Sequence, residues 1–146
     1  IGAEGEIGHI GSTKDETQSE YTDVNDAVRF VNETGVDALA IMVGTAHGRY
    51  KKSPMLAIDR IKEIHSAADA HLVLHGGSGV PDDQIKAAIS AGIRKVNFGT
   101  DVCYSFIDGY EKLDPLSEPL DVIMSETAES VKAFALEKIK LLDAGR

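Results

Sequence analysis

Short apolar runs alternate with amphipathic helical segments along this chain of 146 residues, and this alternation restricts the possible folds more than any other feature. Strands are predicted at residues 1–7, 37–43, 72–74 and 94–98. Helices are predicted from the N-cap Asp23 to Gly35, over about 55–68, from Pro81 to Gly92, from the GTD segment through about Tyr110, and over about 120–142. Because these strands are largely continuous apolar runs, they predict a parallel sheet with helices packed outside it.

The order of strands and helices is compatible with two α/β architectures, a (β/α)8 barrel and an open doubly wound sheet. Four strand–helix units in 146 residues amount to about half of a (β/α)8 TIM barrel, which typically takes about 250 residues. The chain also begins IGAEGEIG, without an initiator methionine and like the middle of a structure already under way. We therefore expect residues 1–146 to form a single domain that supplies half of a barrel and a closing helix.

The composition limits the partners of such a domain. With 24 acidic and 15 basic residues, the net charge of −9 argues against nucleic acid or an anionic membrane as the main partner, although a local pocket can still bind a small anion. The single cysteine, Cys103, fits a reducing compartment. There is neither an apolar run near the roughly 20 residues that span a bilayer nor a signal peptide, so we expect a cytoplasmic protein.

Polar residues and glycines follow each predicted strand. Since all strands of a parallel sheet point the same way, these residues are expected to meet at the carboxyl-terminal edge, where barrels and doubly wound sheets form their sites. The residues expected there are Glu4 and Glu6, His47 in GTAHG, His75 in LHGGSG, and Asn97 with Thr100 in NFGT.

The two histidines at this edge form a candidate metal site. His47 and His75 each stand one residue before a glycine at the ends of consecutive strands, so their imidazoles could converge on one divalent ion such as Zn²⁺. A catalytic zinc usually has three protein ligands, and Glu6 could supply a carboxylate. The alternative is that each histidine is an ordinary hydrogen-bonded core residue. His65 and His71 are expected on the solvated surface.

The glycine-rich loops suggest an anion site beside the histidines. Gly76, Gly77 and Ser78, and the segment 97–100, place backbone N–H groups and hydroxyls where helices begin, and such positions attract anions. The alternative is simple turn chemistry, because glycine is favoured wherever φ must be positive. Neither GxGxxG nor GxxxxGK[ST] occurs, so nucleotide-binding folds have no motif support.

The stretches GEIGHIG, TGVDALAIMVGTAHG, LVLHGGSGVPDDQI, AGIRKVNFGTD and ALEKIKLLDAGR together resemble the class II, metal-dependent ketose-bisphosphate aldolases. The similarity runs nearly end to end in the right order. It covers only the C-terminal half of that family's barrel, from the fifth strand onward. The resemblance implies a homo-oligomer, a dimer or a tetramer, and a phosphorylated ketose as the small-molecule substrate.

The resemblance also implies roles for individual residues. His47 and His75 match two of the three histidines that hold the catalytic zinc, and Glu6 matches an acidic residue near the metal. Further matches are Gly48, Gly76, Gly77 and Ser78 in loops that hold the 1-phosphate and, through carbonyls, a monovalent cation (Na⁺ or K⁺), Asn97 at the dihydroxyacetone part, Thr100 at the phosphate, and Lys51 after HGxY. The third histidine and the general acid/base aspartate of the family match no residue of this chain.

Two departures from the family pattern bear on the substrate. The loop that usually reads GG-x-ED and carries a catalytic glutamate is GSTKDETQSE here, so Glu16, or instead Asp15 or Glu20, would have to serve. Gly99 stands where an acidic residue or asparagine is usual. Both changes favour a different ketose phosphate or a sugar-acid phosphate over fructose bisphosphate.

The resemblance therefore implies a lyase of carbohydrate metabolism, including glycolysis. Its reaction is the retro-aldol cleavage of a phosphorylated ketose to dihydroxyacetone phosphate and an aldehyde, with Zn²⁺ stabilising the enediolate. One alternative is another phosphate-binding barrel, an isomerase or epimerase. A second alternative is a non-catalytic half-barrel fragment that binds metal or phosphate. The isolated chain is predicted to be inactive, because the aspartate and the third histidine are missing.

Overall fold

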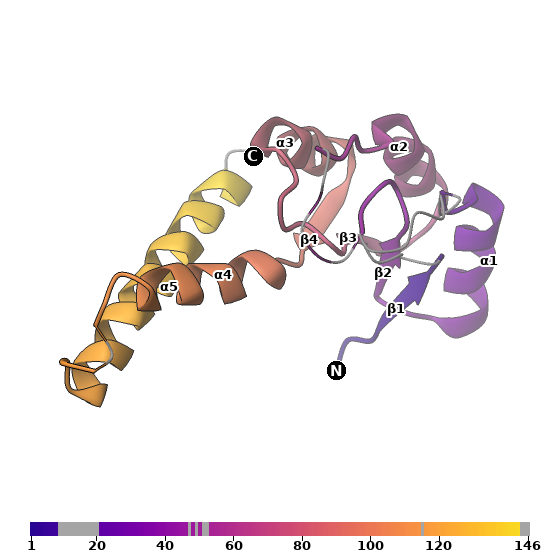
Figure 1. The fold of residues 1–146 in the computed structure, drawn as a ribbon. Coiled ribbons are helices and arrows are strands. Elements are labelled where there is room, and N and C mark those ends of the chain that lie inside the picture. The colour runs from indigo at the N-terminus through magenta and orange to yellow at the C-terminus, as the bar shows by residue number, and fades with distance from the viewer. Residues whose placement is uncertain (9–20, 47, 49, 51–52, 115, 144–146) are drawn as a thin grey trace.

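A computed structural model describes residues 1–8, 21–46, 48, 50, 53–114 and 116–143, and the statements below concern these residues. The strands are β1 (Glu4–Ile7), β2 (Ala38–Ile41), β3 (His71–Leu74) and β4 (Ile93–Val96), and they form one parallel sheet in the order β1-β2-β3-β4 (Figure 1). The helices are α1 (Val24–Thr34), α2 (Ile58–Ala67), α3 (Asp82–Ala91), α4 (Thr100–Tyr110) and α5 (Leu120–Asp143). The predicted succession of strands and helices is thus confirmed.

Helix α1 shows how local sequence sets an element's ends. The carboxylate of Asp23 accepts hydrogen bonds from the backbone N–H groups of Asn25 and Asp26, and Gly35 ends the helix in the left-handed conformation at φ 68°. The N-cap aspartate and the terminating glycine were both predicted from the sequence. The predicted start of α2 near residue 55 is wrong by three residues.

The chain just before α2 is bonded to neighbouring segments and makes a turn of its own. The backbone N–H of Ala57 donates to the carbonyl of Val43 at 2.9 Å, and that of Leu56 donates to the side-chain oxygen of Gln84 at 3.1 Å. The N–H of Ile58 also bonds back to the carbonyl of Leu56 at 2.9 Å, and Ala57 between them has ψ 73°, outside the helical region, so the regular helix begins at Ile58.

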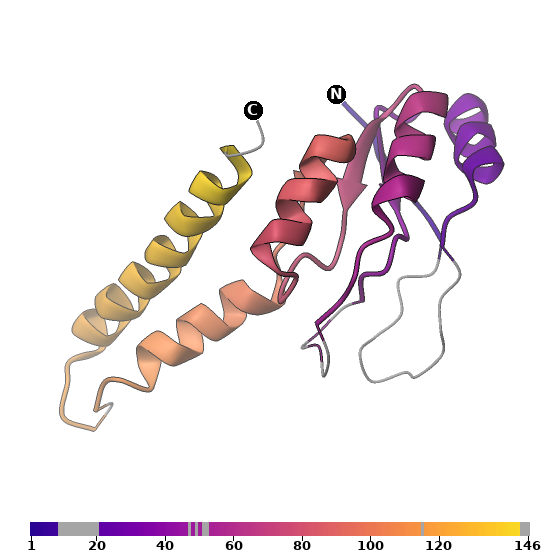
Figure 2. The same cartoon turned by 90° about the horizontal axis from the view of Figure 1, so that it is seen from above.

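Helices α1, α2 and α3 cover one face of the sheet (Figure 2). The fully buried strand residues in this core are Leu39, Ile41, Leu72, Leu74 and Ile93, and their helical partners include Ala27, Ile61, Ile64, Ile85 and Ala88. Consecutive strands lie side by side and their helices share one face, as in the outer ring of a (β/α)8 barrel. A doubly wound sheet places helices on both faces, so the barrel alternative holds.

The strand register defines what the opposite face carries. Glu4 pairs with Ala38 and Glu6 with Ala40, while an irregularity between Leu72 and Val73 brings Val73 opposite Lys95. Since side chains alternate along a strand, Glu4, Glu6 and Lys95 project from the face that α1 to α3 do not cover. We call this the concave face, because it corresponds to the interior of a barrel.

Helices α4 and α5 form a hairpin that extends away from the sheet (Figures 1 and 2). Their contact is close at Gly109, where a Cβ would lie 2.6 Å from Ser130 Oγ. The hairpin exposes large apolar side chains, among them Phe106, Ile107, Leu120, Met124 and Ile139. Within the ranges given above, no helix is long and apolar enough to cross a membrane. The homo-oligomer expected from the sequence stays a prediction.

Candidate functional site

His75 lies directly after β3, at the carboxyl edge of the concave face. Its side chain is only 15% exposed and stands between two carboxylates from β1. Nε2 lies 3.0 Å from Glu4 Oε1, and Nδ1 lies 3.0 Å from Glu6 Oε2. The structure therefore brings together the three residues that the sequence analysis expected at the carboxyl edge of these two strands.

Lys95 extends this group of charges to β4. Its Nζ lies 2.5 Å from Glu4 Oε2. Lys95 thus contacts Glu4, and His75 contacts both Glu4 and Glu6. The hydrogen bond from Lys95 lowers the pKa of Glu4 most, burial opposes this by raising it, and the hydrogen bond to His75 lowers it further. Lys95 was not among the predicted site residues, although its place two residues before Asn97 puts both on one face of the strand.

The two contacts of His75 cannot both be ordinary hydrogen bonds of a neutral ring. A neutral imidazole carries one N–H and one lone pair. If Nε2 donates to Glu4, the lone pair of Nδ1 faces an oxygen of Glu6, and these two atoms attract only when a proton or a metal cation lies between them. A metal cation bound by Nδ1 of His75 and the carboxylate of Glu6 is one arrangement that meets this requirement.

The same pair can be tested against zinc. Zn²⁺ binds nitrogen and oxygen ligands at about 2.1 Å, so two tetrahedral ligand atoms lie roughly 3.4 Å apart. The observed separation of 3.0 Å between Nδ1 and Glu6 Oε2 is a few tenths of an ångström shorter, which a small side-chain rotation can correct. The described part of the chain contains no group of three or more His, Cys, Asp and Glu residues arranged for a metal. The donor set thus fits part of a zinc site, and His47 lies outside the described residues.

The loop after β3 packs against the start of α4. The N–H of Asp101 donates to Ser78 Oγ at 3.1 Å, and the carboxylate of Asp101 accepts the N–H of Gly79 at 2.9 Å. The N–H of Gly77 donates to the carbonyl of Asn97 at 3.0 Å. Ser78 is buried, and these bonds hold the predicted anion-binding loop at the amino end of α4.

The remaining predicted residues fall into two groups. The first group lies near this edge. Gly48 has φ 113° and Gly76 has φ 68°. The N–H of Asn97 donates to the carbonyl of Leu74, and Thr100 begins α4. His47, Lys51, Glu16, Asp15 and Glu20 lie outside the described residues. His65 and His71 are exposed, as expected.

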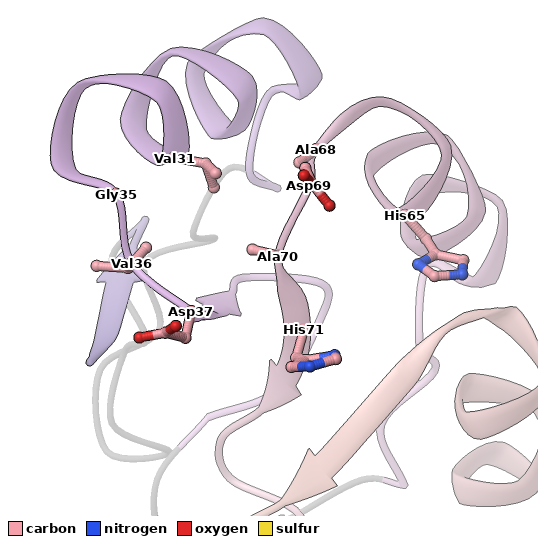
Figure 3. A pocket seen from close by; sticks show the side chains of 9 residues that line it. All are labelled: Val31, Gly35, Val36, Asp37, His65, Ala68, Asp69, Ala70 and His71. Carbon is pink, nitrogen blue, oxygen red and sulfur yellow. The ribbon is translucent and has the colours of Figure 1, made fainter. Parts of the chain in front are cut away.

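A hollow of about 560 Å³ lies at the opposite, amino-terminal edge of the sheet (Figure 3). Its polar side chains are Asp37, His65, Asp69 and His71. In Figure 3 these groups do not converge on one point, and Asp37 Oδ2 already accepts the N–H of Ala3 at 2.7 Å. The hollow therefore offers no assembled set of ligands, and the candidate site is the carboxyl edge.

Comparison with known proteins identifies the family of this chain. The family model described as fructose-bisphosphate aldolase class-II matches residues 1–145. The chain belongs to the class-II fructose-bisphosphate aldolase family. The resemblance of the sequence motifs is thereby confirmed, and the carboxyl edge that bears His75 is the edge where TIM barrels form their active sites.

Several aldolases are similar to this chain. A sulfofructosephosphate aldolase from Alkalicoccus urumqiensis is 39% identical over 145 residues, which are 96% of this chain and 50% of that protein. A 6-phospho-5-dehydro-2-deoxy-D-gluconate aldolase from Shouchella clausii is 36% identical over 150 residues, covering 99% and 51%. The crystal structure of the YdjI aldolase from Escherichia coli K12 matches with a TM-score of 0.84 at 37% identity, over 97% of this chain and 49% of that one. The chain thus spans about half the length of the relatives it matches.

Proposed function

We propose that the protein carrying this chain is a zinc-dependent aldolase that cleaves a phosphorylated ketose to dihydroxyacetone phosphate and an aldehyde. The observation that carries this proposal is the position of His75 between Glu4 and Glu6 on the concave face of a class-II aldolase half-barrel. The chain would supply the C-terminal half of the barrel as a single domain. The general acid/base aspartate and the third zinc histidine would come from the other half.

The residues of this chain would bind and orient the reactants. His75 through Nδ1, Glu6 and His47 would hold the metal, while Glu4 would accept the N–H of Nε2 and fix the ring. Lys95 in turn holds the carboxylate of Glu4. A zinc ion, when bound, supplies positive charge for the electrons that the broken carbon–carbon bond leaves behind.

The loops would bind the parts of the substrate that do not react. Gly77, Ser78 and Thr100 lie where the loop after β3 meets the amino end of α4, and a helix amino terminus favours a phosphate group. Gly48 and Gly76, in the loops after β2 and β3, would complete the phosphate site. Asn97 would contact the dihydroxyacetone part and Lys51 the phosphate, with a monovalent cation on the loop carbonyls. Binding energy from the phosphate would orient the reacting carbons.

The substrate class follows from two considerations. Gly99 has no side chain at a position where the family usually has an acidic residue or asparagine, which argues against fructose bisphosphate. The names of two relatives, a sulfofructosephosphate aldolase and a 6-phospho-5-dehydro-2-deoxy-D-gluconate aldolase, both include a phosphorylated and acidic sugar. We infer a ketose phosphate that carries a further acidic group.

The proposal can be tested on the full-length gene product that carries this sequence. Bound zinc is measured by elemental analysis, and cleavage of phosphorylated ketoses is followed with and without a chelator. We expect chelation to abolish cleavage and added Zn²⁺ to restore it. Cleavage that survives complete metal removal, or isomerisation without cleavage, would contradict the proposal.

Matched histidine variants locate the metal. His75→Ala should lower zinc affinity by at least about 100-fold, since it removes a ligand. His71→Ala is the control, because His71 begins β3, at the end of the strand away from His75, and is exposed. Equal zinc affinity in the two variants would exclude His75 as a ligand.

A further inference from the structure

The loops after β2 and β3 touch each other through their backbones. Gly76 has φ 68°, and a Cβ at this position would lie 2.7 Å from the carbonyl oxygen of Ala46 and 3.3 Å from Cβ of Thr45. Only glycine allows this approach without a shift of the neighbouring chain. The separation of the two loops is therefore set by direct contact at their bases.

The hydroxyl of Tyr50 lies at the same junction. It accepts the N–H of Ala46 at 2.7 Å, and it lies 2.9 Å from the carbonyl oxygen of Ala46 and 3.0 Å from that of Gly76. One hydroxyl proton serves one carbonyl at a time. Its ring lies against the other side of the β3 loop, where a Cβ on Gly79 would be 3.1 Å from Cδ2 of Tyr50.

The environment keeps this hydroxyl able to donate. Tyr50 is half-buried, and burial raises the pKa of its phenol, while the hydrogen bond with Ala46 opposes the rise. The hydroxyl consequently stays protonated at neutral pH. Tyr50 belongs to the chain after β2, so its bond to Gly76 joins residues 26 positions apart.

The backbone partners of this hydroxyl adjoin the candidate metal ligands. Ala46 directly precedes His47, and Gly76 directly follows His75. We propose that Tyr50 is a positioning residue that sets the separation of these two loops and so preorganises His75, beside the Ala46 backbone, for a divalent metal. This inference rests on the proposed function, and nothing in the sequence motifs assigned a role to the hydroxyl.

The expected loss of metal affinity follows from what such hydrogen bonds contribute in other metal sites. Hydrogen bonds that orient metal ligands are typically worth 10- to 100-fold in metal affinity. Tyr50 acts one residue away from each histidine, so the expected loss on removing its hydroxyl is at the lower end, about 10-fold. The ring contact with Gly79 would remain in Tyr50→Phe, and the fold should survive.

The test compares Tyr50→Phe with wild type in the full-length protein. Zinc affinity is measured by competition with a chromophoric chelator, and the ligand geometry is read from the visible spectrum after Co²⁺ replaces Zn²⁺. Hydrogen exchange of the Ala46 amide is measured in the metal-free protein. Tyr110→Phe is the matched control, because that tyrosine is exposed at the end of α4.

We expect Tyr50→Phe to weaken zinc binding about 10-fold, to change the Co²⁺ spectrum and to accelerate exchange at Ala46, while Tyr110→Phe does none of these. Unchanged affinity and spectrum in Tyr50→Phe would overturn the inference and leave the proposed function intact. An affinity loss that is matched by a lower melting temperature and altered circular dichroism of the metal-free variant would also overturn it. Wild-type protein without metal or cleavage would instead reject the proposed function.

Discussion

The two faces of the sheet are built from the same strands, yet the charged side chains of the candidate site lie on one of them. Leu72, Leu74 and Ile93 face the helices and are fully buried among apolar side chains. His75 and Lys95 face the other way and make charged contacts with the carboxylates of β1. In this parallel sheet, the side chains of one face pack against the helices, and those of the other face can bind ligands.

The largest expected effect concerns the covered face. Leu72→Ala should lower the free energy of unfolding by about 2–5 kcal/mol, because it leaves a cavity between β3 and the helices. Its neighbour His71 is exposed, so His71→Ala should change stability by less than about 0.5 kcal/mol. Urea denaturation of metal-free full-length protein measures both. Similar losses in the two variants would erase the proposed difference between the faces.

Glycines with the same φ extend the comparison to the loops. Gly35 and Gly76 both have φ 68°, but a Cβ on Gly35 meets nothing within 4 Å, whereas one on Gly76 would lie 2.7 Å from the carbonyl of Ala46. Gly35→Ala should therefore cost only the left-handed conformation, about 1–2 kcal/mol. Gly76→Ala adds the close contact, for about 2–4 kcal/mol in total. Thermal unfolding compares them, and equal costs would show that the two loops do not touch at Gly76.

The parts of this fold that could be predicted are those that depend on near neighbours. The N-cap at Asp23 and the glycine at position 35 act within one helical turn, and the alternation of Glu4 and Glu6 reveals their shared face. Whether helices cover one face or both depends on the path of the whole chain. The sequence was therefore compatible with both a barrel and a doubly wound sheet, and the observed strand order decided between these two folds.

The candidate site was only partly predictable for the same reason. His75, Glu4 and Glu6 were expected at one edge because every strand of a parallel sheet ends there. Lys95 pairs with Glu4 across 91 positions, and no local pattern indicates that pairing. The start of α2 was misplaced because Ala57 has a non-helical ψ of 73°, and the apolar spacing of the segment does not reveal this turn.

The concave face should affect metal binding more than stability. Glu6→Gln removes the charge opposite Nδ1 of His75 and should lower zinc affinity by about 10- to 100-fold. Glu4→Gln keeps an acceptor for Nε2 and should cost less affinity than Glu6→Gln. Isothermal titration with Zn²⁺ provides the comparison. If Glu4→Gln weakened binding more, the metal would lie on the Nε2 side of the ring.

The smallest expected effect concerns the ion pair between Lys95 and Glu4, measured in the absence of metal. The pKa of Glu4 lies below its ordinary value of 4.5, chiefly because Lys95 donates a hydrogen bond to the carboxylate, with a smaller contribution from His75. A lowered pKa means that Glu4 stabilises the fold at pH values above 4.5, and that this stabilisation is lost as the pH falls through the folded-state pKa. Lys95→Met should raise the pKa of Glu4 toward its ordinary value and reduce this acid-side loss. Because the side chain of Lys95 is 51% exposed, the change at neutral pH should stay below about 1 kcal/mol.

Carboxyl NMR titration of the metal-free protein follows Glu4 directly, with Lys132→Met, whose ion pair lies on α5, as the control. An unchanged Glu4 titration in Lys95→Met would contradict the ion pair between Lys95 and Glu4.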